Sequence, residues 1–442
     1  MMREYFESIT NELFKNTSSN ELLIINFDAE ESNFVRLNKG KIRQAGSVKQ
    51  ISMTLSLSNN DKRNLKSSVR LNGTYDRDIS TLKKALNYLR RELPDLPKDP
   101  YMMFSKSVHS TEISSDRQSI DDKEILEHVM NSASNLDMVG IFSSGSIYTG
   151  LANSLGQKNW HSDFSFSFDY SIYNKKNNAI KLNYSSKKWN EKDYNFILNK
   201  GIEKLAILSN PEKIITTGEY KVYLEPSALN EIIDMMAWGG FSYKSNKIGT
   251  SPLHLLNKKE RQLSELVSIG ENIKDGISAN FNSDGFIKPE EINMITKGKF
   301  TETLTSPRSS LEYAVVHNAA GSSEYPCSID MRAGEIADNK ILETIDNGIY
   351  ISNLWYLNFS DRNNGRMTGL TRFGCFLVEN GKLSAPINTM RFDDSVYSML
   401  GDNLIGLTSS RELLIDSGTY EERSTSSARL PGAIIDNFKM TL

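Results

Sequence analysis

Cysteine and histidine are scarce in this chain of 442 residues. Its two cysteines, Cys327 and Cys375, are too few for a disulfide framework or a cysteine-rich zinc site. The five histidines are scattered, and no two of them have the spacing of metal ligands. No apolar run comes near the roughly 18 residues that a membrane-spanning helix needs. The N-terminal segment is typical of a charged amphipathic helix rather than a signal peptide, so we expect a cytoplasmic protein without membrane contact.

Neither sign of charge dominates the chain. Lysine and arginine number 52 and aspartate and glutamate 55, which gives a net charge of −3. Acidic and basic residues are interspersed, whereas binding to phosphate backbones requires a clustered basic face. We therefore expect no nucleic-acid partner.

The common nucleotide and hydrolase motifs are absent as well. The sequence has no phosphate-binding Gly-x4-Gly-Lys-Ser/Thr loop, no Gly-x-Gly-x-x-Gly and no Gly-x-Ser-x-Gly elbow. Neither cysteine has an adjacent histidine that could activate a thiolate, and Cys375 lies in an apolar run that predicts a core position. Nucleotide, dinucleotide and serine hydrolase chemistry are therefore unsupported.

The length and the hydrophobic pattern predict two domains of the α+β class. The polar stretch 209–218, punctuated by Pro211 and Gly218, is the best boundary. It places an N-terminal α+β domain at residues 1–212 and a β-rich, antiparallel C-terminal domain at residues 213–442. In the first domain we predict helices at 2–16, 78–93, 121–133 and 194–208 and strands at 22–27, 34–37, 50–57 and 64–71, with a second set of strands between 138 and 184. The strand at 50–57 alternates cleanly and should bury one face.

A β-hairpin is predicted in the C-terminal half. Phe373 to Val378 is an apolar strand, Asn380-Gly381 is the turn, and the returning strand from Lys382 carries Pro386 late in its course. Asn-Gly between apolar runs is a strong hairpin signal, because both turn positions require positive φ.

The segment around this hairpin resembles the C-terminal signature of the TldD/PmbA family. The residues that carry the resemblance are Thr368-Gly369-Leu370-Thr371-Arg372, Phe376 to Lys382, Pro386 and Arg391-Phe392. The family comprises bacterial and archaeal peptide-processing proteins, in which one branch is a zinc protease and the other is its metal-free partner. The resemblance is dense from Gly218 onward and loose before it, and it implies an α+β N-terminal domain and a β-dominated C-terminal domain.

The zinc branch of that family carries His-Glu-x-x-x-His on the helix that follows the boundary strand. Counted from Pro226, the three motif positions fall here on Asp234, Met235 and Gly239. A shifted register that uses Glu231 as the motif glutamate puts Asn230 and Met235 at the ligand positions; neither register supplies a histidine.

The family's third ligand, a cysteine near the C-terminus, also has no counterpart, because residues 400–442 contain neither cysteine nor histidine. A tetrahedral zinc site cannot be completed without these ligands. The helix from Pro226 instead fits an amphipathic core helix with Glu231 and Asp234 on its exposed side. The residues expected to face inward are Leu229, Ile232, Ile233 and Met236.

The resemblance and the missing motif together predict the metal-free, PmbA/TldE-like branch. By resemblance the chain would be a non-catalytic, peptide-handling subunit without a cofactor of its own. It would pair with a zinc-bearing TldD-like paralogue as a cytoplasmic heterodimer, or form a homodimer, and hold extended peptides by strand addition. One alternative is an active metallopeptidase with Glu225, Glu231 and Asp234 as ligands or base, where oxygen ligands favour Mg or Mn. Another is a scaffold without catalysis.

Two further patterns have competing interpretations. Residues 280–291 match part of an EF-hand loop, but Asn280 stands at the first ligand position and Lys288 at the ninth, so a strand turn is favoured over calcium binding. An aromatic cluster either lines a peptide groove or alternates in a half-buried strand. Its members are Tyr350, Trp355, Tyr356 and Phe359.

Overall fold

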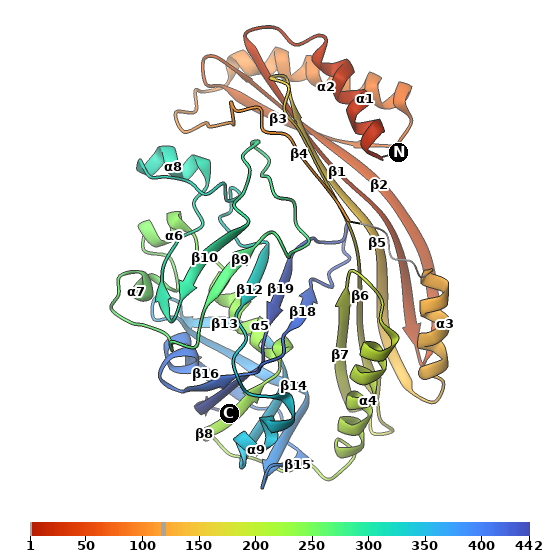
Figure 1. The fold of residues 1–442 in the computed structure, drawn as a ribbon, viewed down its shortest axis with the longest axis vertical. Coiled ribbons are helices and arrows are strands. Elements are labelled where there is room, and N and C mark those ends of the chain that lie inside the picture. The colour runs from red at the N-terminus through yellow and green to blue at the C-terminus, as the bar shows by residue number, and fades with distance from the viewer. Residues whose placement is uncertain (1, 116–120) are drawn as a thin grey trace.

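The computed structural model describes residues 2–115 and 121–442. The first seven strands form one long, curved sheet (Figure 1) in the order β3-β2-β1-β5-β6-β4, with β7 also paired to β6. The strands are β1 (Glu21–Asn38), β2 (Lys41–Asn59), β3 (Asn64–Leu71), β4 (Thr111–Ser114), β5 (Asp137–Asn153), β6 (Lys158–Tyr173) and β7 (Ala179–Ser186). All pairs are antiparallel except β4 with β6.

Four helices accompany this sheet, close to where the sequence predicts them. They are α1 (Met2–Phe14), α2 (Tyr75–Glu92), α3 (Asp122–Ser132) and α4 (Glu191–Ile207). The alternation in β2 is confirmed, since Ile51, Met53, Leu55 and Leu57 are buried in a core that α1 and α2 share. The opposite face of β2 is polar, as a one-sided strand requires.

The prediction of two separate strands at 22–27 and 34–37 is wrong. β1 continues through both as one strand, although the residues between them are polar except for Ala29. Glu30, in this middle part, is buried and accepts hydrogen bonds from Gln50 Nε2 at 2.7 Å and from the backbone N–H of Arg423 at 3.1 Å. A polar residue can lie in a buried strand when its hydrogen bonds are met by distant partners, and those partners leave no local signal.

The second half of the chain contains two further sheets. The strand order of the first is β11-β10-β9-β12-β19-β18. The strand order of the second is β13-β8-β20-β16-β14-β15. In this second sheet β13 also pairs with β14, and β17 pairs with β20. Their strands are β8 (Gly218–Leu224), β9 (Ile269–Asn272), β10 (Glu291–Thr296), β11 (Lys299–Phe300), β12 (Ser328–Met331), β13 (Gly348–Asp361), β14 (Arg366–Glu379), β15 (Lys382–Pro386), β16 (Arg391–Ser395), β17 (Leu404–Leu407), β18 (Glu412–Ile415), β19 (Ser427–Leu430) and β20 (Ala433–Met440). Most pairs are antiparallel, and β8–β13 and β12–β19 are parallel.

Short helices lie between these strands: α5 (Pro226–Ala237), α6 (Tyr243–Lys247), α7 (His254–Asn257), α8 (Pro307–Tyr313) and α9 (Ile341–Ile345). The predicted hairpin is confirmed, because Asn380 and Gly381 connect β14 to β15 with φ of 52° and 70°. Cys375 is buried in the core, as predicted. No helix among the described residues is both long and apolar enough to cross a bilayer.

The α+β class is confirmed, with helices and strands in both halves of the chain. The domain boundary between residues 212 and 213 stays a prediction. No strand of the first sheet pairs with a strand of the other two among the described residues. The halves nevertheless share a hydrophobic cluster, in which Phe168 and Tyr194 join Tyr350 and Phe376.

Candidate functional site

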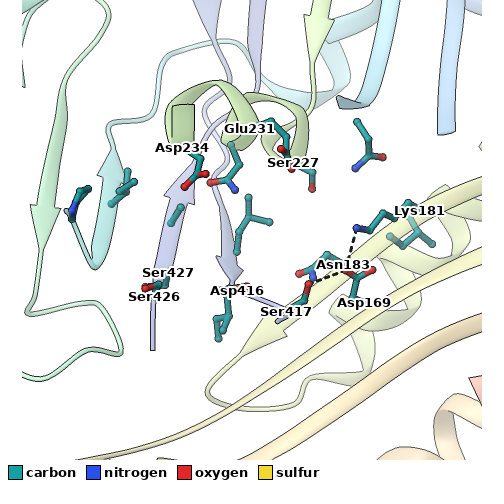
Figure 2. Close-up of a pocket in the computed structure, with 18 of the residues that line it drawn as sticks. Asp169, Lys181, Asn183, Ser227, Glu231, Asp234, Asp416, Ser417, Ser426 and Ser427 are labelled. Atoms are coloured by element: carbon teal, nitrogen blue, oxygen red, sulfur yellow. Dashed lines mark hydrogen bonds and ion pairs between the residues drawn. The ribbon is translucent and has the colours of Figure 1, made fainter. Parts of the chain in front are cut away.

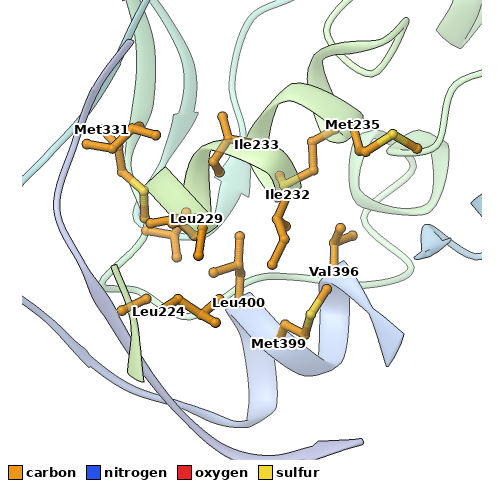
Figure 3. Close-up of a cluster of buried hydrophobic side chains, with 14 of the residues drawn as sticks. Leu224, Leu229, Ile232, Ile233, Met235, Met331, Val396, Met399 and Leu400 are labelled. Atoms are coloured by element: carbon orange, nitrogen blue, oxygen red, sulfur yellow. The ribbon is translucent and has the colours of Figure 1, made fainter. Parts of the chain in front are cut away.

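Helix α5 holds its position by burying one face. Pro226 occupies its first turn, where proline is tolerated because the N–H would have no helical partner. Leu229, Ile232 and Ile233 are fully buried against residues from β8 and from the segment around Met399 (Figure 3). The predicted inward face of α5 is therefore confirmed, and the helix has little freedom to move.

The opposite face of α5 forms one wall of a groove of about 380 Å³ (Figure 2). Side chains from α5 line it at helical spacing: Ser227, Asn230, Glu231 and Asp234. Residues of β6 and β7, of β12 and the segment before it, of β13, and of β18, β19 and the segment between them complete the walls. Residues far apart in the chain thus meet at a single cavity between the N-terminal sheet and α5.

One ion pair lies on the wall that β6 and β7 contribute. Lys181 Nζ lies 3.1 Å from Asp169 Oδ2, and the hydroxyl of Ser417 donates to the same carboxylate oxygen at 3.0 Å (Figure 2). The charge of Lys181 is therefore largely balanced within the wall. Glu231, Asp234 and Asp416 also line the groove, so its remaining charge is acidic.

The two carboxylates of α5 have different surroundings. Desolvation by the groove walls raises the pKa of Glu231 although its side chain stays exposed, the nearby charge of Asp234 raises it further, and Lys181 opposes the shift. Asp234 accepts a hydrogen bond from the hydroxyl of Tyr325, and burial together with this bond raises the pKa of Tyr325. Glu231 has no hydrogen-bond or ion-pair partner among the described residues, so it is the carboxylate free to bind a ligand or take up a proton.

The third carboxylate candidate, Glu225, lies outside this groove. Its carboxylate accepts hydrogen bonds from Lys204 Nζ and from the hydroxyl of Tyr350, on α4 and β13. The sequence groups Glu225 with Glu231 and Asp234 because they are close along the chain. The structure brings Glu231 and Asp234 together and places Glu225 in a separate cluster.

The residues at the zinc motif positions do not fit a zinc ion. In the first register Asp234 faces the groove, but Met235 is buried in the core and Gly239 has no side chain. In the register that uses Glu231, Asn230 faces the groove and Met235 again does not.

Among the described residues, no group of three histidine, cysteine, aspartate or glutamate side chains is arranged to hold a metal ion. We therefore derive no chemical step from a metal at this groove.

The calcium-like segment is a strand turn. Phe281 and Ile287 form an antiparallel bridge, and Asn282 Oδ1 accepts hydrogen bonds from the backbone N–H of Asp284 at 3.0 Å and of Phe286 at 3.1 Å. Gly285 has a φ of 87°, which suits glycine at a tight turn. The Asn282 side chain thus shapes the turn itself.

The aromatic cluster divides in the structure. Tyr350 is buried and hydrogen-bonded to Glu225, whereas Trp355 and Tyr356 are exposed in the middle of β13. The guanidinium of Arg372 lies 3.9 Å from the centre of the Trp355 ring. None of these aromatic residues lines the groove on α5, so the four do not form one peptide-binding surface.

Sequence reasoning missed most of the groove. Asp169, Lys181, Tyr325, Asp416 and Ser417 all line it, and none of them belongs to a recognisable motif. They meet because the register of three sheets brings them to the same place, and one sequence carries no signal of that register.

Comparisons with known proteins place this geometry in context. Residues 217–442, just over half of the chain, match the family described as PmbA/TldA metallopeptidase C-terminal domain. No curated protein matches the chain in sequence.

Solved structures resemble the whole chain. TldE from Thermococcus kodakarensis superimposes with a TM-score of 0.76 at 14% identity, covering 99% of this chain and 100% of that one. A proposed modulator of a DNA gyrase from Thermotoga maritima gives 0.75 at 14% identity and covers both chains completely. A proposed modulator of DNA gyrase from Bacteroides thetaiotaomicron gives 0.73 at 15% identity, covering 99% and 98%. At such identities the likeness shows a shared fold alone.

Proposed function

The chain belongs to the TldD/PmbA family, and we propose that within this metallopeptidase-like family it is a peptide-handling subunit without a catalytic metal of its own. The groove on α5 would bind an extended peptide, and a paralogue carrying His-Glu-x-x-x-His would supply the zinc and the hydrolysis. Both subunits would act in the cytoplasm, in the breakdown or maturation of peptides.

One observation carries the proposal. The polar groove is lined by two edge strands and by helix α5, and α5 has no histidine. β7 and β18 both contribute residues to the groove and lie next to each other, and among the described residues each is hydrogen-bonded to only one strand, β6 and β19 respectively. An unpaired strand edge can add a further strand through backbone hydrogen bonds, which selects extended peptides largely regardless of sequence.

The side chains of the groove support binding rather than covalent chemistry. Asn183, Asn230 and Ser227 offer amide and hydroxyl groups that suit a peptide backbone. Two of the acidic groups are already engaged, Asp169 with Lys181 and Asp234 with Tyr325. An acidic lining repels phosphate backbones, so we propose no nucleic-acid role despite the names of two structural relatives.

A second function rests on Glu231. Its raised pKa and lack of a partner suit a general base. An active hydrolase would use Glu231 and Asp234 directly. A scaffold that binds no peptide is the third possibility, and it predicts no affinity at this groove.

Peptide cleavage and peptide binding distinguish these functions. We expect no cleavage of labelled unstructured peptides by this chain alone and robust cleavage when the zinc-bearing paralogue is added. Glu231→Gln and Asp234→Asn should leave the rate of the pair within a few-fold, as should the control Glu203→Gln on the exposed side of α4.

Two results would contradict the proposed peptide-handling role. Chelator-sensitive cleavage by the chain alone, lost by orders of magnitude in Glu231→Gln or Asp234→Asn, would favour the hydrolase. A chain that neither binds labelled peptide nor changes the paralogue's activity would favour the scaffold.

A further inference from the structure

An arginine on β14 lies beside the groove on α5. Asn353 of β13 lines that groove, and Arg372 of β14 lies directly opposite Asn353 in the antiparallel pair of these strands. Side chains directly opposite each other in such a pair project from the same face of the sheet. The side chain of Arg372 therefore projects from the sheet face that carries Asn353.

The neighbours of β13 and β14 place this arginine near the start of α5. α5 lies beside β13 (Figure 1), and the backbone N–H of Glu225, just before the helix, donates to the carbonyl of Ile351 at 3.0 Å. On the other side β14 contacts β7, which belongs to the facing wall of the groove. A Cβ atom on Gly374 would lie only 2.6 Å from Ile180 Cδ1, so the two strands pack closely at this point. Arg372, two residues before Gly374, therefore lies near the groove at the end where α5 begins.

Aromatic rings hold the guanidinium of Arg372 and leave its donors unused. The guanidinium lies 3.9 Å from the centre of the Trp355 ring and 5.0 Å from that of Phe373. Among residues 2–115 and 121–442, no oxygen atom accepts a hydrogen bond from it and no carboxylate pairs with it. A guanidinium carries five N–H donors in a planar fork. Stacking restrains the plane of this fork while its edge stays open to a ligand.

A second stacked arginine differs in this respect. The guanidinium of Arg362 lies 5.0 Å from the centre of the Trp238 ring and 4.7 Å from that of Phe359. Its N–H groups donate to the backbone carbonyls of Trp238 and Thr250. Arg362 thus attaches the end of α5 to the segments beside it. Arg372 has similar aromatic support without such acceptors.

The backbone beside Arg372 is strained at two aromatic residues. φ is 60° at Phe373 and 58° at Tyr356, and the register of β13 and β14 shifts next to both. Bulky side chains resist this region, which glycine or asparagine would occupy more readily. Tyr356 is 76% exposed, and its ring centre lies 5.6 Å from that of Trp355. Core packing does not account for an aromatic side chain at this position, and such strain recurs at ligand-binding sites.

A solvated cation–π pair is the simpler interpretation, because stacked arginines are common in proteins. That interpretation accounts for Arg372 on Trp355. It does not account for the strained, exposed Tyr356 beside the pair. It also leaves an arginine without an acceptor next to a groove whose own carboxylates do not pair with it. These two observations favour a ligand that brings an anion.

We propose that Arg372, stacked on Trp355 and Phe373, binds the C-terminal carboxylate of the peptide in the α5 groove, an inference that rests on the function proposed above. A planar guanidinium can donate to both oxygens of one carboxylate. Glu231 and Asp234 disfavour acidic side chains within the groove, whereas every unmodified peptide ends in a carboxylate. Strand addition and a terminal anchor would together select peptides by backbone and chain end, largely regardless of sequence.

Peptides that differ only at the C-terminus test this subsite. Fluorescence anisotropy measures the Kd of a short unstructured peptide, labelled at its N-terminus, as the free acid and as the C-terminal amide. The wild type should bind the free acid about tenfold more tightly, the lower end of what hydrogen bonds to a charged group contribute. An amidated peptide that ends in glutamate should bind as weakly as the plain amide, which distinguishes a terminal carboxylate from an acidic side chain.

Variants of Arg372 identify the group that reads the carboxylate. Arg372→Gln should weaken binding of the free acid about tenfold and leave binding of the amide within about twofold, which also shows that the variant is folded. Arg372→Lys keeps the charge without the planar fork, so it should keep part of the preference. Arg77→Gln on α2 is the matched control, because Arg77 is exposed and forms no ion pair with a described residue; it should keep the full preference.

Each other result overturns a stated part of the argument. Equal affinity of the wild type for acid and amide overturns the subsite and leaves the proposed function standing. A preference that survives in Arg372→Gln, or tight binding of the amidated peptide that ends in glutamate, overturns the subsite as well. A wild type that binds none of the peptides overturns the proposed function and this inference with it. If Arg372→Gln binds neither peptide, Arg372→Lys decides: a reduced preference supports the subsite and an undiminished one overturns it.

Discussion

Replacing Arg423 tests how the segment between β18 and β19 is held against the N-terminal sheet. Arg423 is only 6% exposed, and its guanidinium enters the polar face of that sheet. Nη1 donates to the carbonyl of Gly145 at 3.1 Å, and Nη2 donates to the carbonyl and the hydroxyl of Ser165 at 2.9 and 3.1 Å. This segment also lines the α5 groove through Asp416 and Ser417, so its attachment shapes the proposed binding site.

Arg423→Met removes the guanidinium and keeps an apolar stem of similar length. Hydrogen bonds to a charged group contribute roughly 1.5–3 kcal/mol each, and a buried acceptor left unpaired costs about 1–3 kcal/mol. The three contacts share one cation and do not add independently. Burial also lowers the pKa of Arg423 to about 10. Desolvation of the charge therefore offsets part of the stability that these hydrogen bonds contribute. We expect a net loss of about 3 kcal/mol, the low end of the range for a broken buried network.

Urea unfolding gives the stability change, and limited proteolysis reports on the segment itself. Tyr420 is 91% exposed, so release of the segment should speed cleavage beside it. Arg423→Lys keeps the charge but not the planar fork of donors, and should fall between the wild type and Arg423→Met. Arg77→Met, at an exposed site on α2, should stay within about 0.5 kcal/mol of the wild type. An Arg423→Met protein with unchanged stability and unchanged cleavage would refute this account of the segment.

Gly381→Val should lower the free energy of unfolding by about 1–3 kcal/mol, because a β-branched residue resists the φ of 70°, although the new Cβ itself would make only ordinary van der Waals contacts with Leu342 and Glu343; a smaller loss in Gly381→Ala is the control, and a neutral melt contradicts the prediction. Asp28→Asn should flatten the dependence of stability on pH. Desolvation by the surrounding protein and the charge of Glu422 raise the pKa of Asp28 from 3.8 to about 6. Its side chain is nevertheless exposed, so solvent screens part of this effect and the change in stability should be small. The folded wild type holds this proton more tightly and should lose stability as pH rises from about 4 to about 6; equal slopes for both proteins in urea titrations across this range would argue otherwise. The protein purified alone should carry no stoichiometric zinc, and elemental analysis that finds about one zinc per chain after dialysis against a weak chelator would reverse that expectation.

The sequence predicts the elements whose signals are local. The hairpin at Asn380-Gly381 follows from two adjacent positions that require positive φ, and the start of α5 follows from a proline that suits only the first helical turn. The inward face of α5 follows from a helical period of apolar residues. In each case the residues that decide the conformation lie within a few positions of one another, so long-range contacts are not needed to infer it.

Features that depend on residues far apart in the chain could not be predicted from the sequence. The polar middle of β1 is a strand because Gln50 and Arg423 meet the hydrogen-bonding needs of Glu30. Glu225 does not lie with Glu231 and Asp234, as the sequence suggested, because it is hydrogen-bonded to Lys204 and Tyr350 instead. The groove could not be predicted for the same reason, since the register of the strands brings the residues of its walls together.

The two faces of helix α5 have different roles: one packs in the core and the other lines the groove. Its inner face fixes the helix through buried side chains, while the groove-facing positions Asn230, Glu231 and Asp234 have no packing role in the core. Substitutions at exposed positions usually cost little stability, so the residues that face the groove can change without loss of the fold. Structures at 14–15% identity share this architecture, and a shared fold does not fix the chemistry of such a face. The function proposed for this chain rests on the few side chains on that one helical face and on the strand edges beside it.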